Sequence, residues 1–132
     1  MRRLFLAVAG LASILVLGAA AGCRTYHTPP MDRRITVSPD LGYRIWVTDV
    51  RLAKDLDAQH FTLQANVVNN TQGVQRLEYR VAWLDANGVE IDSIMSSWIK
   101  RSVAPREVVG LKAVAPSPDA CDFRFYVQRE RR

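Results

Sequence analysis

The chain is poor in the residues that build cross-linked or reactive sites. Its 132 residues include two cysteines, Cys23 and Cys121, and two histidines, His27 and His60. This number of cysteines excludes a disulfide-stapled miniprotein, and the set lacks the closely paired Cys and His ligands of a structural zinc site. Calcium-loop spacing, glycine-rich phosphate loops and internal repeats are also missing from the sequence.

Neither histidine is well placed to serve as the base that most nucleophilic sites require. His27 lies in a proline-containing segment, and we expect His60 to be a partly exposed residue at the start of a strand. Asp122 is next to Cys121, but strand alternation sends neighbours to opposite faces. We therefore expect no catalytic residue, no metal and no cofactor. A small enzyme is the remote alternative to the binding functions considered below.

The first 22 residues contain no acidic residue, and Arg2 and Arg3 are their only charges. An apolar stretch and a run of small residues follow, which is the pattern of a secretory signal. The ending A-A-G-C at 20–23 resembles a bacterial lipobox. That resemblance implies cleavage between Gly22 and Cys23 and attachment of lipid to Cys23.

Two other interpretations of this segment stay open. The uncharged stretch 4–22 is just long enough for an uncleaved membrane anchor, and Cys23 of a plain secreted protein would be free to pair with Cys121. For the lipoprotein, several acyl chains on Cys23 give stable anchoring, since each buried CH₂ adds about 0.8 kcal/mol. Arg24 follows the cysteine, where enterobacterial lipoproteins retained at the inner membrane carry aspartate. We therefore expect a protein anchored in the outer membrane and facing the periplasm.

The rest of the chain divides into a tether and one domain. Residues 24–34 lack apolar periodicity and contain Pro29 and Pro30, which favours a stiff polyproline II tether of about 34 Å. The expected boundaries are thus 1–22 for the removed signal, 23–34 for the lipidated cysteine and tether, and 35–132 for the domain.

Apolar and polar residues alternate with a period of two in three segments of the domain, 61–67, 76–83 and 122–128. This period predicts antiparallel strands with one buried face. Asn-rich and Gly-containing turns at 69–73 and 85–88 separate the segments. Further strands are expected at 43–53, 89–95, 107–114 and 35–38, whereas 96–102 is ambiguous. About six or seven short strands predict an all-β, immunoglobulin-like sandwich.

These segments resemble the YcfL-like family of periplasmic lipoproteins. The resemblance rests on NNT at 69–71, LEYRVAWLDANG at 77–88, Trp98 and AVAPSPDACDFRFYV at 113–127. It implies a compact β-sandwich and a lipid anchor, and it defines no catalytic residues. An enterobacterial member is encoded beside a lipoprotein activator of a penicillin-binding protein, which hints at a role in the cell envelope.

With no reactive cluster, we expect a protein-interaction module in envelope biogenesis or maintenance, joined to the membrane through Cys23. The alternative is a module that binds peptidoglycan or lipopolysaccharide through an arginine-rich surface. Nucleic acid is not an expected partner, since no aromatic residues interleave with the arginines. The candidate interaction residues are Arg76, Arg80, Trp98, Arg129, Arg131 and Arg132.

Three side chains have a core and a surface interpretation. Trp46 and Trp98 are expected in the core, as most tryptophans are, although both would suit a partner if exposed. Cys121 is expected to be buried on the face of Phe123 and Phe125. Glu78 is expected to share an exposed strand face with Arg76 and Arg80.

Overall fold

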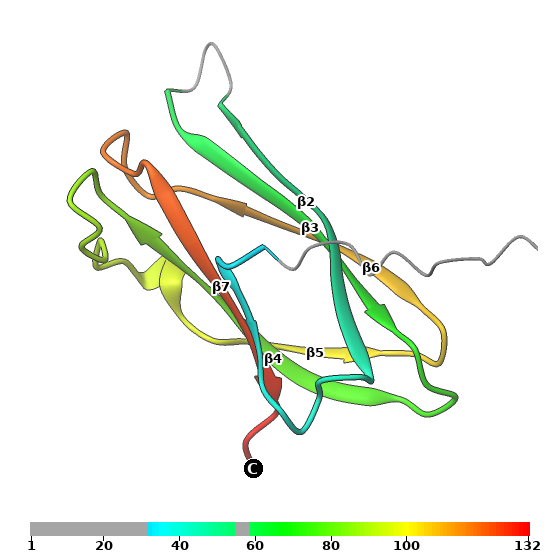
Figure 1. Cartoon of the computed structure of the whole chain (residues 1–132). Coiled ribbons are helices and arrows are strands. Elements are labelled where there is room, and N and C mark those ends of the chain that lie inside the picture. Colours follow the sequence, from blue (N-terminus) through cyan, green and yellow to red (C-terminus); the bar gives the residue numbers. More distant parts are fainter. Residues whose placement is uncertain (1–31, 55–58) are drawn as a thin grey trace, which may run out of the picture.

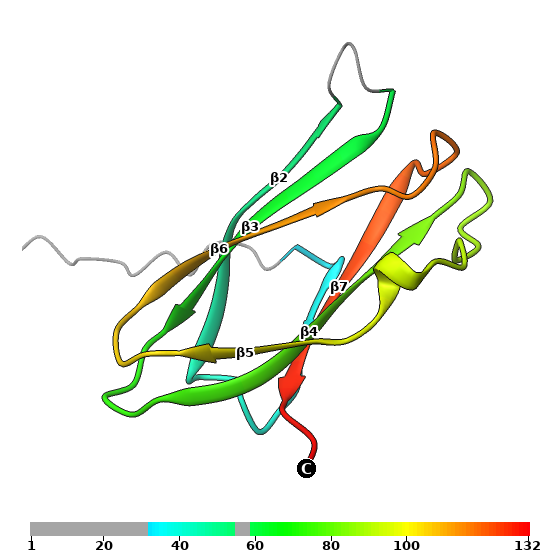
Figure 2. The ribbon, with the colours of Figure 1, turned by 180° about the vertical axis from the view of Figure 1, so that it is seen from behind.

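The computed structural model describes residues 32–54 and 59–132. They form two β-sheets packed face to face (Figures 1 and 2). The expected signal, cleavage site and lipidation site, including Gly22 and Cys23, lie outside the described residues. No helix within the described residues is long and apolar enough to cross a membrane.

The described residues contain seven strands, which confirms the expected all-β sandwich. The elements are β1 (Ile35–Val37), β2 (Ile45–Lys54), β3 (Phe61–Asn69), β4 (Gln75–Leu84), the 3₁₀ helix η1 (Ile94–Ser96), β5 (Ile99–Val103), β6 (Val108–Val114) and β7 (Asp122–Arg129). One sheet has the order β1-β7-β4-β5 and the other has the order β2-β3-β6.

Strand pairing is antiparallel except at the start of the domain, where β1 runs parallel to β7 and Ile35 lies opposite Phe125. A parallel pair requires a long connection between its strands, and here the rest of the sandwich provides it. The central ladder of the larger sheet joins β4 to β7 along eight residue pairs, from Leu77–Arg129 to Leu84–Asp122.

The core lies between the sheets and follows the alternation in the sequence. Trp83 of β4 and Phe123 of β7 pack edge to face with ring centroids 6.3 Å apart, and both are almost fully buried. From the smaller sheet, β3 contributes every second residue. The buried core residues of β3, β4 and β7 include Leu63, Ala65, Val67, Leu77, Val81, Phe125 and Val127.

The Asn-rich turn after β3 connects the two sheets, and a buried amide holds it. Asn69 is 0% exposed, and its Nδ2 donates hydrogen bonds to the carbonyl oxygens of Gly73, Val103 and Ala104. Its Oδ1 accepts hydrogen bonds from the backbone N–H and the hydroxyl of Thr71. One side chain therefore ties the β3–β4 turn to the end of β5.

The turn after β4 is confirmed, but the strand expected at 89–95 is wrong. The Asp85 carboxylate accepts backbone hydrogen bonds from Asn87 and Val89, and Gly88 has a φ of 77°, which suits glycine. In the part of the chain that the structure describes, one isolated bridge follows, between Leu84 and Glu90. Ser93 then caps η1 by accepting from the Met95 N–H, because serine competes for backbone groups that a strand would pair.

The segment 96–102, which is ambiguous in the sequence, contains a strand in place of the one expected at 89–95. Residues 99–103 form β5, which pairs with the first half of β4. The connection from Glu90 to Ile99 therefore runs along the outside of this sheet edge, and Figure 1 shows η1 within it beside β4.

Candidate functional site

The arginines that the sequence proposed as an interaction surface are mostly paired with acids. Arg80 pairs with Glu90, and its guanidinium lies 5.9 Å from the centre of the Tyr126 ring. Arg129 Nε lies 3.0 Å from Asp40 Oδ2. These contacts neutralise the two arginines, so neither presents an open cationic site.

Glu78 lies near Arg131 and is buried, which corrects the expectation of an exposed residue. Its side chain accepts a hydrogen bond from Gln128 Nε2, and Arg131 Nε lies 3.9 Å from its Oε1. Glu78 sits between the neighbouring strands β5 and β7, opposite Lys100 and Gln128. The long side chains of the two neighbouring strands cover Glu78. The alternation of residues along one strand does not show which side chains of the neighbouring strands will cover it.

The remaining candidates are Arg76, Arg132 and Trp98, and the Arg76 carbonyl oxygen accepts a hydrogen bond from the N–H of Glu130 near the chain end. Arg76 is exposed opposite Ser102, and Arg132 is exposed at the end of the chain. Trp98 is 39% exposed, whereas the sequence favoured a core position. It precedes β5, an edge strand, so no further strand of the described chain covers it.

Trp98 instead belongs to an exposed apolar stretch, here called the apolar ridge and made up of Ile94, Met95, Trp98 and Ile99. Their exposed fractions are 91%, 57%, 39% and 46%. Ile94 and Met95 lie in η1, Trp98 lies in the connection after it, and Ile99 is the first residue of β5. Large apolar residues that gather outside a core mark interaction sites more often than isolated ones do.

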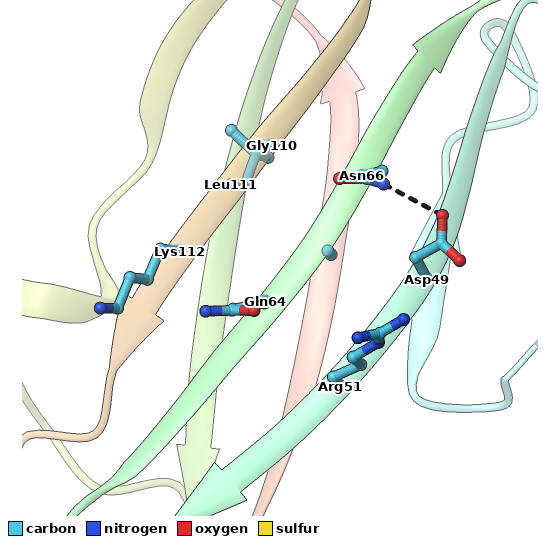
Figure 3. A pocket seen from close by; sticks show the side chains of 8 residues that line it. Asp49, Arg51, Gln64, Asn66, Gly110, Leu111 and Lys112 are labelled. Atoms are coloured by element: carbon cyan, nitrogen blue, oxygen red, sulfur yellow. Dashed lines mark hydrogen bonds between the residues drawn. The ribbon is translucent and has the colours of Figure 1, made fainter. Parts of the chain in front are cut away.

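A second surface lies on the outer face of the smaller sheet, and the sequence had not singled it out. This surface, here called the polar depression, has a volume of about 490 Å³ (Figure 3). Its polar side chains come from all three strands of the sheet. The lining residues are Asp49, Arg51, Gln64, Ala65, Asn66, Gly110, Leu111 and Lys112.

An irregularity in β2 shapes this depression. The register between β2 and β3 shifts between Thr48 and Arg51, and Asp49 there has a φ of 52°. Asn66 Nδ2 donates a 3.0 Å hydrogen bond to Asp49 Oδ2, as Figure 3 shows. The bulge thus turns a carboxylate towards the middle of the sheet face. The alternation in β3 places Asn66 and Gln64 on this outward face, but a bulge leaves no signature in alternation.

Trp46 lies on the same outer face, and its expected core position is also wrong. It is 56% exposed and pairs with Val68 of β3. Val68 pairs in turn with Val108, which is also 56% exposed. Trp46 points outward because its neighbour Ile45 takes the inner position and is 1% exposed.

The remaining candidates for chemistry are separate from one another. His60 Nδ1 makes a 3.1 Å hydrogen bond to the carbonyl oxygen of Ala115. Cys121 is exposed, so its expected burial is wrong. Strand β7 begins only at Asp122, and the alternation that places Phe123 inward does not extend back to the cysteine. Within residues 32–54 and 59–132, no three Cys, His, Asp or Glu residues are grouped to hold a metal ion.

Comparisons with known proteins give a family and a fold. Residues 33–129 match the model of a family described as "Protein of unknown function (DUF1425)". No curated protein matches the chain.

Two solved structures are similar in fold. A DUF1425 family member from Shewanella sp. pv-4 has 20% sequence identity and a TM-score of 0.60, over 67% of this chain and 80% of that one. The Campylobacter jejuni protein cj0090 has 17% identity and a TM-score of 0.61, over 75% of this chain and all of that one (100%). At these identities the likeness shows the fold alone.

Proposed function

The chain belongs to the DUF1425 family of proteins of unknown function, and we propose that it is a non-enzymatic lipoprotein of the outer membrane that binds another envelope protein. Its domain faces the periplasm in this proposal. The sequence supports the anchor through the signal-like residues 1–22 and the lipobox-like ending at Cys23. Arg24 after the cysteine supports the outer membrane, and the resemblance to YcfL-like lipoproteins agrees with both.

The apolar ridge is the observation that carries the binding role. Its four side chains expose large apolar areas in η1, in the connection after it and at the first residue of β5, although Ser96 beside them is buried and η1 contacts β4. Burying apolar surface against a partner would release about 25 cal/mol per Å². A tryptophan is also one of the residues most enriched at the energetic centre of interfaces.

The strand that follows the ridge specifies the partner's chemistry. Strand β5 is at a sheet edge, and an extended segment of another protein can add to such an edge through backbone hydrogen bonds. Lys100 and Arg101 of β5 are exposed directly after the ridge. Lys100 is already paired with Glu130, whereas Arg101 has no ion pair among the described residues. We therefore propose an extended partner segment with apolar side chains and at least one acid.

Photo-crosslinking in cells tests this binding role. A photoreactive amino acid at Ile94 is expected to capture a discrete envelope protein, and mass spectrometry would identify it. The matched control is the same amino acid at Ala53, an exposed residue of β2 on the other sheet. Equal adducts from both positions, or none from Ile94, would contradict the proposed surface.

The anchor has a separate test. In the mature protein, the first peptide is expected to begin at Cys23 and to carry acyl chains. In the Cys23→Ser variant, the protein found in the membrane fraction is expected to keep residues 1–22 and to carry no acyl chain. Mass spectrometry of the purified membrane form checks this. A mature peptide that begins before Cys23 would overturn the lipoprotein assignment without affecting the apolar ridge.

A further inference from the structure

The polar depression differs in chemistry from the apolar ridge and lies on the other sheet. We propose that it binds a saccharide that carries a carboxylate. This inference does not depend on the proposed function, because it uses only the outer face of β2, β3 and β6.

One row of residues across the sheet supplies positive charge. Arg51, Gln64 and Lys112 lie opposite one another on the three strands. Neighbouring strands are about 4.8 Å apart, so the Cα atoms of Arg51 and Lys112 lie about 10 Å apart with the Gln64 amide between them. Neither cation has an ion-pair partner among the described residues. Both are long enough to reach a carboxylate placed above Gln64, and arginine can bind it through two parallel hydrogen bonds.

The next row supplies neutral and acidic groups, which is why a sugar fits better than a bare anion. Asn66 lies opposite Thr48 and Gly110, about 7 Å along the strand from Gln64. The Asp49 carboxylate beside Asn66 repels an anion but accepts hydrogen bonds from hydroxyl groups. The ligand must therefore present hydroxyls at one end and an acid at the other.

The floor of the depression is open because Gly110 has no side chain. A Cβ added there would be 3.7 Å from Asn66 Oδ1, an ordinary contact, so packing of the sheet does not require glycine. Glycine inside a strand is unfavourable and often marks a close approach by a ligand. Asp49 adds backbone strain at the same place through its φ of 52°, and such strain is concentrated at functional sites.

A third row extends the site with apolar surface. Trp46, Val68 and Val108 lie across the sheet on the other side of the Asn66 row. The flat indole of Trp46, 56% exposed, can pack against the apolar face of a sugar ring. From this row to the Arg51 row is about 14 Å along the strand, which leaves room for a further ring beside the acidic sugar.

Titration followed by nuclear magnetic resonance tests the proposal on the full ¹⁵N-labelled chain in a zwitterionic detergent. The probes are glucuronic acid and N-acetylmuramic acid, each compared with its uncharged counterpart, glucose or N-acetylglucosamine. At least one acidic sugar is expected to shift the side-chain amide signals of Gln64 and Asn66 and the Gly110 signal, with at least tenfold higher affinity than its counterpart.

Other outcomes would overturn the proposal. They are no response to either acidic sugar, an equal response to the neutral sugars, an equal response to acetate or inorganic phosphate, or shifts confined to the other sheet.

Variants separate the site from the fold. Arg51→Gln combined with Lys112→Gln is expected to weaken acidic-sugar binding at least tenfold, whereas Arg124→Gln, an exposed control on β7, leaves it unchanged. Gly110→Val is expected to fill the floor and weaken binding by a similar factor without lowering the thermal midpoint. Full binding by either depression variant, or equal loss in the Arg124 control, would contradict the assignment.

Discussion

At the scale of single residues, Asn69 is a polar group whose burial depends on complete pairing. Its amide is bonded to carbonyl groups of the β3–β4 turn and of the end of β5. An unpaired buried acceptor costs about 1–3 kcal/mol, and removing this side chain would leave several carbonyls unpaired at once. The neighbouring Asn70 contributes only its backbone, whose N–H donates to the Arg44 carbonyl oxygen.

We predict that Asn69→Ala lowers the free energy of unfolding by about 2–3 kcal/mol. Asn70→Ala is the matched control and should change it by less than about 0.5 kcal/mol, since the Asn70 side-chain amide nitrogen has no partner to lose. Urea unfolding followed by circular dichroism measures both. Equal effects of the two substitutions would contradict the role given to Asn69.

A second prediction at this scale concerns Cys121. Its side chain is exposed, with Sγ 3.4 Å from the carbonyl oxygen of Asp119. We expect iodoacetamide to alkylate Cys121 in the folded protein, as read by peptide mass spectrometry. Labelling that begins only after denaturant is added would show that the thiol is buried. The control is the Cys121→Ser variant, in which the corresponding peptide should carry no label.

At the scale of elements, an ion pair holds the segment that leads into β1. Arg34 donates hydrogen bonds to the Asp32 carboxylate and lies 4.4 Å from the centre of the Phe123 ring. The guanidinium of Arg34 holds the pKa of Asp32 below its ordinary value of 3.8. Because the pKa of Asp32 is lower in the folded chain than in the unfolded chain, the ionised carboxylate stabilises the fold above about pH 4. This contribution is lost as the pH falls through the lowered pKa and the carboxylate is protonated.

We therefore predict that Asp32→Asn is less stable than the unchanged chain at pH 6, by at most about 1 kcal/mol because the pair is partly exposed. The difference should shrink as the pH falls below 4. Urea unfolding at several pH values measures it. Asp92→Asn, at an exposed carboxylate without an ion pair among the described residues, serves as the control. A difference that is constant from pH 6 to pH 2.5 would contradict the assignment.

The two elements that carry exposed tryptophans give a further prediction. Trp46 of β2 and Trp98 before β5 are 56% and 39% exposed, whereas Trp83 of β4 is 1% exposed. Iodide is expected to quench the fluorescence of the first two and not of the third. Trp46→Phe and Trp98→Phe should each remove part of the quenchable emission. A single tryptophan that accounts for all quenching would contradict one of the two placements.

At the scale of the whole molecule, the alternation of apolar and polar residues predicts the two packed sheets better than it predicts which side chains are exposed. Alternation in β3, β4 and β7 correctly predicts which residues form the core between two sheets. It fails at residues 89–95, where Ser93 and its helix cap interrupt the pattern. It also fails at Trp46, because a β-branched neighbour took the inner position that a tryptophan usually occupies.

The polar depression was beyond prediction for a different reason. Its cationic row depends on which residues of β2, β3 and β6 lie opposite one another, and the bulge at Asp49 shifts that register. A glycine inside a predicted strand at Gly110 was the one available signal. The arginine surface, in contrast, was visible in the sequence, but its ion pairs were not, because Arg80 meets Glu90 only across the turn after β4 and Arg129 meets Asp40 from the other end of the domain.

The short parallel strand at the start of the domain has a mechanical consequence. Strand β1 is joined to β7 through three residue pairs, whereas the β4–β7 ladder has eight. Tension applied at the N-terminal side would therefore load the shortest ladder of the sheet first. Its release would lengthen the link by about 3.3 Å for each residue freed, while the six other strands kept their pairing. In a chain held from that end, β1 would therefore detach from β7 before the other strands of the sandwich separate.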